Sequence, residues 1–485
     1  MSTLVKEEER TDLTSGNLFK KLVLYTLPIL LTSILSLLFT TVDLLTVSWF
    51  GGGANSMGAI GTNSAAINLL VGLFLGLGTG ANIVAANAKG LGDRVRAFRT
   101  TQSAMVLGLI AGVLIALVGW FVAEPILIAI NCDPELLKDA TLYLQIYLAG
   151  APIILIYNFG AAILRAYGDS RRPLYALLIS GVFNIGLNML FVIAFDWDVM
   201  GVALGTILSQ LVGAIAVIYF LHYDKRLFVN FRFSKLKLYK DETISILKLG
   251  LSAGLQSVIF SITNVMIQAA VNSFGALATA GNSASNTIEG YQYLVLNSIS
   301  MATMTFIAQN NGARKKENVL KSLKYGILLE LTVPTVLGIG IFIFRRPLMM
   351  LFISENEPGF EQILEYGYGR IMTIAIIYGV CGVNECFSAY YRGMKYSLFP
   401  TAVSLVGIIG LRIFFLLVLF PLDFFHNLYW VFATYPISWS ICIIIYLCFF
   451  KSKSKKVFDT YDEPYVLEKR TNDITYQEES RKNIN

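Results

Sequence analysis

Long stretches of apolar residues, almost free of charge, fill most of this 485-residue chain. A helix needs roughly 20 such residues to cross the hydrocarbon core of a membrane. Only 14% of the residues are charged, whereas soluble proteins carry about 25%. The chain is therefore predicted to be an all-α polytopic membrane protein, which argues against a secreted enzyme, a nucleic-acid-binding protein or a disordered scaffold. The twelve apolar runs predicted as transmembrane helices are residues 22–49, 58–86, 102–123, 139–164, 174–195, 199–222, 244–273, 280–308, 320–344, 361–389, 398–420 and 428–450.

The loops between these runs differ in their content of basic residues. Loops after even-numbered runs hold 18 Lys and Arg residues, and loops after odd-numbered runs hold three. Short loops on the cytoplasmic side of a membrane carry an excess of Lys and Arg. We therefore predict a multi-pass protein of the cell membrane with both termini in the cytoplasm, and the even number of runs agrees with this orientation.

The longest basic loop divides the twelve runs into six and six. It mixes aromatic and basic residues, a composition that is attracted to anionic lipid headgroups. We predict two six-helix lobes joined by this cytoplasmic linker and flanked by two cytoplasmic tails. The predicted parts are an N-terminal tail at 1–21, an N-lobe at 22–222, the linker at 223–243, a C-lobe at 244–450 and a C-terminal tail at 451–485.

The two halves share an internal repeat. Arg165 ends run 4 and Pro173 opens run 5, and the same eight-residue interval separates Arg392 from Pro400, 227 residues further on. Each half has six runs and starts on the same side, so an axis along the membrane normal should relate the halves. Paired bundles of this type bind substrate near the midplane, where they meet, and work by alternating access.

One acid, Asp43, lies inside run 1. A charge at the centre of a membrane costs at least about 2.5–3.5 kcal/mol, so such a residue needs an explanation. Pro28 precedes it in the same run and can bend the helix by removing a backbone hydrogen bond. We predict that Asp43 carries a proton or binds a cation. The structural alternative is an Asp that pairs with a donor on a neighbouring helix.

Polar residues in runs 4 to 6 are candidates to surround Asp43. Asn184 and Asn188 are one turn apart and share a helix face, and Thr206 lies in the next run. Together they are predicted to form the cation or proton coupling site, with Asn158 close by as a residue of the substrate cavity. Amide groups that join helices to each other are the alternative interpretation.

Run 7 carries a stripe of four amides at spacings of four or eight residues. A polar stripe cannot face lipid, so it lines either a cavity or a contact between helices. We predict that most of this stripe and two polar residues of run 8 belong to the substrate cavity. The stripe consists of Gln256, Asn264, Gln268 and Asn272, and the residues of run 8 are Asn282 and Glu289.

Three further charged residues of the predicted spans need an explanation. Glu385 in run 10 and Arg412 in run 11 form the predicted charged site of the C-lobe, either as an ion pair or as a second titrating site. Arg412 is predicted to be the only clear base inside the membrane. Glu330 in run 9 has no partner evident in the sequence, and snorkelling at the lipid edge and a function are equally compatible with its position.

The motifs of the common enzyme classes are absent. The sequence contains no Walker A motif and no HExxH or GxSxG motif. The chain is therefore predicted not to be an enzyme and to use no metal and no cofactor besides a coupling ion, H⁺ or Na⁺. The expected partners are small organic molecules and the lipid bilayer, without nucleic acid, and we expect a monomer.

Several segments together resemble a known family. The start LPILLTSILSLLFTTVDLLTVSWFG, the segment LRAYGDSRRP after run 4 and TYPISW at 434–439 resemble the multidrug and toxic compound extrusion (MATE) family of the MOP flippase superfamily, and its DinF-like branch in particular. The resemblance covers residues 18–450. It implies a MATE-like fold of two pseudo-symmetric six-helix bundles and an efflux pump that exchanges H⁺ or Na⁺ for lipophilic, often cationic, compounds.

The resemblance also assigns roles to residues. It implies that Asp43 is a main coupling residue and that the first helix bends near Pro28. The N-lobe pattern of the family reads Asn-x-x-x-Asp in span 5 with a Thr in span 6, which Asn184 and Thr206 match. Asn188 departs from it and leaves Asp43 as the only acid of this site.

The C-lobe fits the family less uniformly. The residues Glu289, Glu385 and Arg412 stand at positions typical of the branch, whereas Ser252 stands where a Pro is frequent. The alternative within the superfamily is a flippase for lipid-linked oligosaccharides, which would require a strongly basic cavity. A membrane enzyme or receptor is the third hypothesis, and the six-plus-six repeat opposes it.

Overall fold

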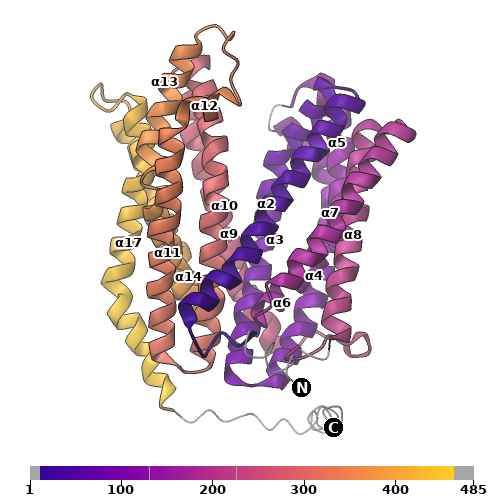
Figure 1. Ribbon diagram of the computed structural model, residues 1–485, viewed down its shortest axis with the longest axis vertical. Coiled ribbons are helices and arrows are strands. Elements are labelled where there is room, and N and C mark those ends of the chain that lie inside the picture. Colours follow the sequence, from indigo (N-terminus) through magenta and orange to yellow (C-terminus); the bar gives the residue numbers. More distant parts are fainter. Residues whose placement is uncertain (1–10, 130–131, 225–226, 464–485) are drawn as a thin grey trace.

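The computed structural model describes residues 11–129, 132–224 and 227–463, and in this part of the chain all regular elements are helices, joined by loops and without strands (Figure 1). Helices are the expected result, because backbone groups inside a membrane must find their hydrogen bonds within the chain. The helices of the first half are α2 (Leu18–Phe50), α3 (Ala54–Leu91), α4 (Arg94–Ala129), α5 (Pro134–Ala149), α6 (Ala151–Ala166), α7 (Arg171–Met189) with its π-helical extension η1 (Leu190–Ala194), and α8 (Asp198–Tyr223).

The second half contains more interruptions than the first. Several of its helices continue through π-helical turns, which carry one extra residue and often occur at functional positions. Its elements are α9 (Lys240–Asn272), α10 (Ala276–Gly312), α11 (Lys316–Ile343), α12 (Arg345–Met350), α13 (Phe360–Arg370), η3 (Ile371–Ala375), α14 (Tyr378–Gly393), α15 (Leu398–Ser404), η4 (Leu405–Gly410), α16 (Leu411–Phe414), η5 (Phe415–Leu419) and α17 (Leu428–Phe458), with short 3₁₀ turns at η2 (Phe233–Lys235) and η6 (Asp459–Tyr461).

The predicted fold class, an all-α polytopic membrane protein, is confirmed. Within the described residues, eight helices are long and apolar enough to cross a membrane, and ten spans result if each of two bent pairs counts as one. The bent pairs are α5 with α6, at 49°, and α13 with α14, at 43°. The two other predicted runs, 58–86 and 280–308, fall within α3 and α10, which are 38 and 37 residues long. The count of twelve spans thus stays a prediction. Length and composition of the described helices support ten of the twelve.

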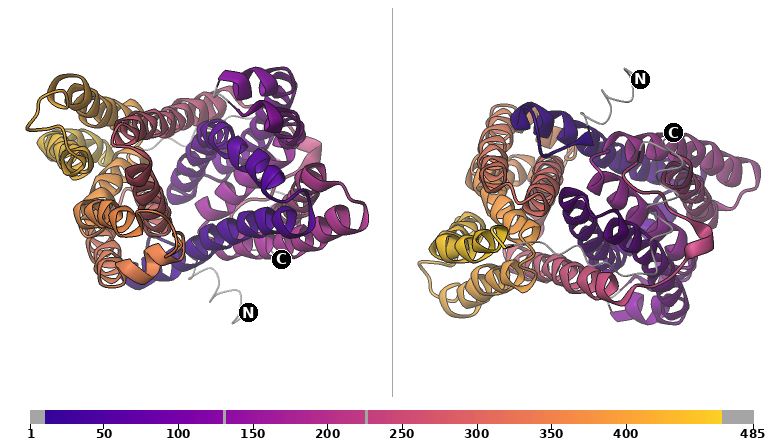
Figure 2. Two further views of the ribbon diagram at one scale, coloured as in Figure 1. Left: turned by 90° about the horizontal axis from the view of Figure 1, so that it is seen from above. Right: turned by 90° about the horizontal axis from the view of Figure 1, so that it is seen from below.

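The helices gather in two bundles that lie side by side. In Figure 1 the bundles splay apart at one end and approach at the other, where α2 begins and α17 ends, and Figure 2 shows the same two groups from above and below. We call this closed end the terminal side. The contacts between the bundles run mainly from α3 to α9 and α10, and from α2 to α10.

The division into lobes and tails stays a prediction, although the helix bounds can be compared with it. The helix α8 ends at Tyr223, where the linker was predicted to start, and α9 begins at Lys240, before its predicted end. Both predicted tails overlap helices, because α2 begins at Leu18 and α17 continues to Phe458. Residues 1–10 and 464–485 of these tails lie outside the described ranges.

Glycines let α3 and α9 touch backbone to backbone. A Cβ atom on Gly76 would lie 2.2 Å from the backbone nitrogen of Gly254, and one on Gly80 would lie 2.4 Å from the carbonyl oxygen of Ile246. Small residues permit such contact where lipid offers no hydrophobic drive for helix association. The closed terminal side therefore depends on the absence of side chains at these positions.

Polar side chains add hydrogen bonds between the bundles on the terminal side, beside an apolar cluster in which Tyr25 of α2 packs on Phe306 of α10. The Thr305 hydroxyl of α10 donates to Asn82 Oδ1 of α3 at 3.0 Å, and Gln309 Nε2 donates to the Ala166 carbonyl at the end of α6 at 2.6 Å. Asn87 Nδ2 donates to the Ala308 carbonyl at 3.5 Å. Three hydrogen bonds thus join α10 to the first bundle.

We expect a larger residue at Gly76 to open the terminal side. In Gly76→Val the new side chain meets the Gly254 backbone, and overpacking of this kind costs about 1–3 kcal/mol, enough to shift a conformational equilibrium about 5- to 150-fold. Spin labels at Arg94 and Lys316, in a variant whose five cysteines are replaced by serine, should report a longer distance. Gly340→Val is the matched control, because nothing lies within 4 Å of a Cβ there. An unchanged distance in Gly76→Val would contradict this account.

Candidate functional site

The residues predicted around Asp43 meet in the first bundle. Asp43 lies in α2 with 7% of its surface exposed. Asn188 Nδ2 of α7 donates to Asp43 Oδ1 at 2.5 Å, and the Thr206 hydroxyl of α8 donates to Asp43 Oδ2 at 3.2 Å. Asn184 lies one turn earlier on α7, near the same carboxylate. The structure therefore brings together all four residues of the predicted coupling site, while their role stays a prediction.

The Asp43 site has spare oxygen atoms and lacks a basic partner. Within the described residues, no Lys or Arg forms an ion pair with Asp43, and its other titratable neighbours are Tyr143 and Tyr147 of α5. Asn184 Oδ1 and Asn188 Oδ1 are buried and find no hydrogen-bond partner in the described ranges. A carboxylate and two amide oxygens are the hard ligands that alkali cations prefer, and a protonated carboxyl would also fit this setting.

Pro28 lies inside α2 without ending the helix. The helix runs unbroken from Leu18 to Phe50, and the Thr32 hydroxyl donates to the Pro28 carbonyl at 2.7 Å. A proline inside a helix leaves the carbonyl four residues earlier without its usual donor, which weakens the helix at that turn. Asp43 thus lies on a helix that is weakened near Pro28. The bend of this helix stays a prediction.

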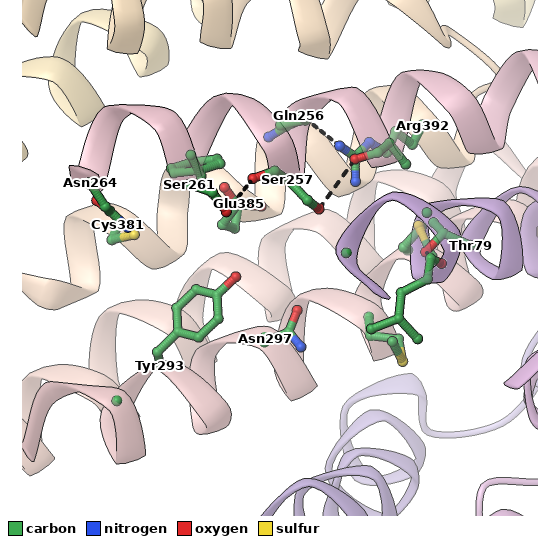
Figure 3. A pocket seen from close by; sticks show the side chains of 18 of the residues that line it. Thr79, Gln256, Ser257, Ser261, Asn264, Tyr293, Asn297, Cys381, Glu385 and Arg392 are labelled. Carbon is green, nitrogen blue, oxygen red and sulfur yellow. Dashed lines mark hydrogen bonds between the residues drawn. The ribbon is translucent and has the colours of Figure 1, made fainter. Parts of the chain in front are cut away.

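A cavity of about 580 Å³ lies between the two bundles. Its wall combines aromatic side chains of the second bundle with polar residues of α3, α6, α9 and α14. Figure 3 shows part of this wall, with Tyr293, Gln256, Glu385 and Arg392. The predicted cavity residues that line it are Asn158, Gln256, Asn264 and Glu289. Gln268 and Asn282 do not line it. Asn158 also does not reach Asp43, because its amide donates to the Ile154 carbonyl at 2.8 Å on its own helix.

The polar stripe of α9 changes its role along the helix. Gln256 accepts a hydrogen bond from Arg392 at the cavity wall (Figure 3), and Asn264 Oδ1 accepts from the Tyr435 hydroxyl at 3.3 Å. Further along, Gln268 Nε2 donates to Asn272 Oδ1 at 2.8 Å. The first two amides therefore face the cavity, and the last two form contacts between polar side chains beside it.

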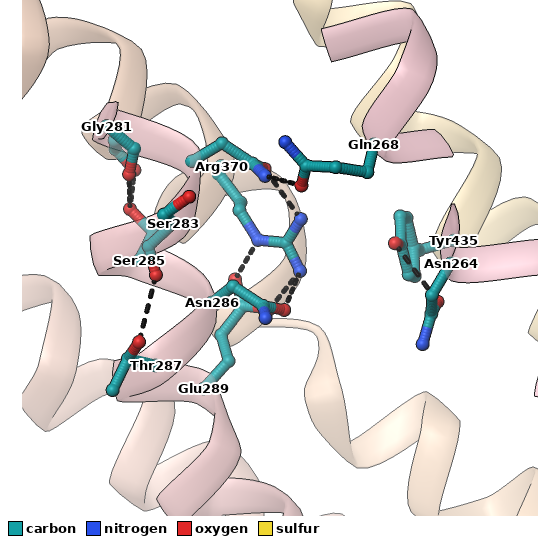
Figure 4. Close-up of polar contacts among 12 residues, drawn as sticks. Asn264, Gln268, Gly281, Ser283, Ser285, Asn286, Thr287, Glu289, Arg370 and Tyr435 are labelled. Carbon is teal, nitrogen blue, oxygen red and sulfur yellow. Dashed lines mark hydrogen bonds and ion pairs between the residues drawn. The ribbon is translucent and has the colours of Figure 1, made fainter. Parts of the chain in front are cut away.

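A buried ion pair that the sequence did not predict connects α10 and α13. Arg370 donates from Nε and Nη2 to the two carboxylate oxygens of Glu289, at 3.1 and 2.8 Å, and both side chains are 4% exposed (Figure 4). Its remaining N–H groups reach Asn282 Oδ1 at 2.8 Å and Asn286 Oδ1 at 2.9 Å. Asn282 in turn donates to Gln268 Oε1 at 2.8 Å. The amides predicted for the cavity instead hold this ion pair.

The prediction that Arg412 is the only clear base inside the membrane is therefore wrong. Arg370 lies within the predicted run 361–389, and its charge inside an apolar run was the signal that could have identified it. It ends α13, directly before the π-helical turn η3 and the bend towards α14. Gln292 Nε2 supports this bend by donating to the Ala375 carbonyl at 2.9 Å and to the Pro334 carbonyl at 2.6 Å.

Glu385 and Arg412 both line the cavity, but no ion pair joins them in the described part of the chain. Arg412 donates to the Ser438 hydroxyl at 3.2 Å and lies 4.0 Å from the centre of the Tyr435 ring. The basic neighbour of Glu385 is Arg392. The predicted pair is thus replaced by two separate contacts, because α14 and α16 present these side chains to different neighbours.

Glu330 is buried inside the second bundle, so snorkelling at the lipid edge is ruled out. Its side chain on α11 is fully buried, and the Ser300 hydroxyl of α10 donates to Oε1 at 3.1 Å. The other carboxylate oxygen has no partner among the described residues. Glu330 does not line the cavity. As a fully buried acid with one hydroxyl donor, it is a second candidate for proton binding.

Two bundles of membrane-spanning helices, closed at one end around a polar and aromatic cavity, are the architecture of a membrane transporter. The sequence model of the MatE family matches residues 28–190 and 252–418, about two-thirds of the chain. The chain belongs to the MatE family, and the resemblance drawn from the sequence is confirmed at this level. Its DinF-like branch stays a prediction.

Known relatives extend over most of the chain. The probable multidrug resistance protein YpnP of Bacillus subtilis is 29% identical over 406 residues, which cover 83% of this chain and 88% of the relative. The probable multidrug resistance protein YoeA of the same organism is 24% identical over 91% of this chain and 95% of its own. A crystal structure of MATE in the bent conformation matches 93% of this chain and 99% of its own with a TM-score of 0.83 at 20% identity, which shows a shared fold.

Proposed function

We propose that this protein exports small lipophilic organic compounds from the cell by alternating access, in exchange for H⁺ or Na⁺. The observation that carries the proposal is the Asp43 site, where a buried acid without a basic partner among the described residues accepts hydrogen bonds from Asn188 and Thr206. Desolvation makes a lone carboxylate costly, so binding a proton or a cation there is strongly favourable. The multidrug resistance names of both Bacillus relatives support export of varied compounds.

The cavity and the contacts between the bundles fit one state of such a cycle. The bundles touch on the terminal side, which the basic loops predict to face the cytoplasm, and they splay at the other end (Figure 1). This arrangement corresponds to the state that releases substrate outside the cell and accepts the coupling ion. Ion binding at Asp43 would change the hydrogen bonds between α2, α7 and α8 and favour the opposite state. We infer a monomer in the cell membrane without further cofactors.

A lipid-linked flippase is a second candidate because the cavity is more basic than its sequence indicated. Four arginines line the cavity wall, namely Arg165, Arg370, Arg392 and Arg412. Basic pockets between transmembrane helices bind anionic headgroups. This observation keeps the flippase hypothesis open beside the exporter, and a transport assay separates the two.

Gradient-driven dye movement in proteoliposomes tests the proposed function. We expect an imposed pH gradient or an imposed Na⁺ gradient to drive a lipophilic dye across the membrane, and an ionophore that collapses the effective gradient to stop it. Protein-free vesicles are the control. Absence of dye movement under both gradients, together with translocation of a fluorescent lipid-linked pyrophosphate, would favour the flippase and overturn the exporter.

A further inference from the structure

The charges of the cavity wall do not cancel. Four arginines line it, but the titratable acids of the wall are two glutamates, Glu289 and Glu385. Glu289 is fully engaged by Arg370, and Glu385 has Arg392 as its basic neighbour. The wall therefore keeps two positive charges in surplus. In a medium of low dielectric constant, such a surplus repels cations and attracts anions over several ångströms.

The surplus charges are Arg412 and Arg165. Arg412 is 1% exposed, and its titratable neighbours are Tyr435, two cysteines and Arg370, without an acid. For Arg165, the corresponding neighbours are Tyr157 and Tyr25. Each bundle thus contributes one arginine without a carboxylate partner in the described part of the chain.

Arg412 has a free donor beside an aromatic wall. Its Nε and Nη2 atoms share the Ser438 hydroxyl, at 3.3 and 3.2 Å, whereas Nη1 is buried and without a partner among the described residues. The Arg370 guanidinium lies 5.3 Å from the centre of the Tyr435 ring, on which Arg412 also packs. A buried guanidinium N–H without an acceptor is costly, and an oxyanion is its strongest partner.

The internal repeat places two of the four arginines at matching positions of the two bundles. Arg165 and Arg392 are 227 residues apart, lie at the ends of α6 and α14, and line the same cavity. The carbonyls at these helix ends are occupied, because Gln309 donates to Ala166 and Asn311 Nδ2 donates to Gly393 at 3.2 Å. Those carbonyls are therefore less available to neutralise the two guanidinium groups.

Resting on the proposed export function, we propose that the cavity selects organic anions: compounds with an aromatic or lipophilic body and at least one carboxylate or phosphate group. The oxyanion binds Arg412 Nη1, with Arg165 as the second surplus charge that attracts it. The body of the compound packs on aromatic residues of the wall, among them Tyr293, Tyr378 and Trp439. Cationic compounds of the same shape are disfavoured by the positive surplus.

Two xanthene dyes of similar shape and opposite charge test this proposal. Binding of carboxyfluorescein and rhodamine 6G to the purified full-length protein in zwitterionic nanodiscs is measured by fluorescence anisotropy. We expect carboxyfluorescein to bind at least about tenfold more tightly than rhodamine 6G, the ratio given by one charge-assisted hydrogen bond. Equal affinities, or tighter binding of rhodamine 6G, would overturn the proposal.

Matched variants separate a binding role from a structural one. Arg412→Gln and Arg165→Gln should each weaken carboxyfluorescein binding about tenfold and leave rhodamine 6G binding unchanged or tighter. The Arg412→Lys variant keeps the charge and should retain most of the affinity. Arg346→Gln is the control, because Arg346 is exposed and pairs with Glu361 outside the cavity. Equal loss of both dyes in Arg412→Gln would mean that Arg412 only supports the fold, and the subsite would be refuted.

An anionic lipid headgroup offers the same oxyanion as a soluble compound. A competition experiment with phosphatidylglycerol distinguishes these two kinds of ligand. If phosphatidylglycerol in the nanodisc competes with carboxyfluorescein in the wild type but not in Arg412→Gln, the subsite accepts lipid headgroups. If competition is absent, its ligand is a soluble anion, and both results support an oxyanion site. Gradient-driven transport of rhodamine 6G without preference for carboxyfluorescein would refute the anion site and leave the proposed export function intact.

Discussion

Asp43→Asn is expected to abolish gradient-driven transport while the protein remains folded. Asparagine has the same shape as aspartate and can keep hydrogen bonds to Asn188 and Thr206, but it neither takes up a proton nor carries the charge that holds a cation. Removal of a buried carboxylate without a basic partner should leave the stability unchanged or increase it. Dye movement in proteoliposomes should fall to the rate of protein-free vesicles, and the thermal midpoint should not decrease.

Two further variants test whether a loss of transport is specific to the carboxyl group of Asp43. Glu361→Gln removes an exposed acid outside the cavity and should transport at the wild-type rate. Asp43→Asn combined with Asn188→Asp moves the carboxyl across one hydrogen bond, from α2 to α7, and should restore part of the transport. If Asp43→Asn alone transports at the wild-type rate under either gradient, coupling depends on another acid, and Glu330 is the next residue to replace.

Loss of one member of the Glu289–Arg370 pair should produce the largest fall in stability. Arg370→Met leaves a buried carboxylate without its partner, and such a change costs about 3–5 kcal/mol. Asn282 and Asn286 lose a donor in the same variant. The thermal midpoint of the purified protein, followed by intrinsic fluorescence, should fall by about 5 °C or more.

The double variant Glu289→Met with Arg370→Met tests the reason for that fall. Replacing a buried ion pair with apolar residues of similar volume is often neutral, so the double variant should regain most of the stability lost by Arg370→Met. Arg346→Met is the matched control, because it breaks an exposed pair worth at most about 1 kcal/mol. A double variant that is less stable than either single variant would show that the pair does not act as a unit.

Local spacing and the family resemblance together predicted most of the Asp43 site, although Asn158 does not reach it. Asn184 and Asn188 share a face because they are one turn apart, and an acid in an apolar helix must meet polar groups of its neighbours. The fold class followed from the long apolar runs for a similar reason. Both inferences depend on the membrane, because a chain that crosses it must form helices, and a charged side chain within it must face other helices or a cavity.

The partners of the C-lobe charges could not be predicted in this way. Pairing of Glu385 with Arg412, or of Glu289 with Arg370, depends on the rotation of α14, α16, α10 and α13 about their axes, which spacing along one helix does not determine. The π-helical turns η3, η4 and η5 lie beside Arg370 and Arg412. Each of them carries one extra residue, which rotates the side chains that follow about the helix axis. The sequence thus placed Glu289, Glu385 and Arg412 inside the membrane, but it missed Arg370 and did not determine which charges meet.

The bonds that close the terminal side have a consequence for the energy of the transport cycle. Three hydrogen bonds from α10 hold the first bundle there, and each contributes about 1 kcal/mol net, because water replaces the partner when the bond breaks. One monovalent ion that crosses a potential of about 100 mV releases about 2.3 kcal/mol. These three bonds are thus of the same order as the energy that one proposed coupling ion would supply, and the packing of α3 against α9 adds to the energy that reopening requires.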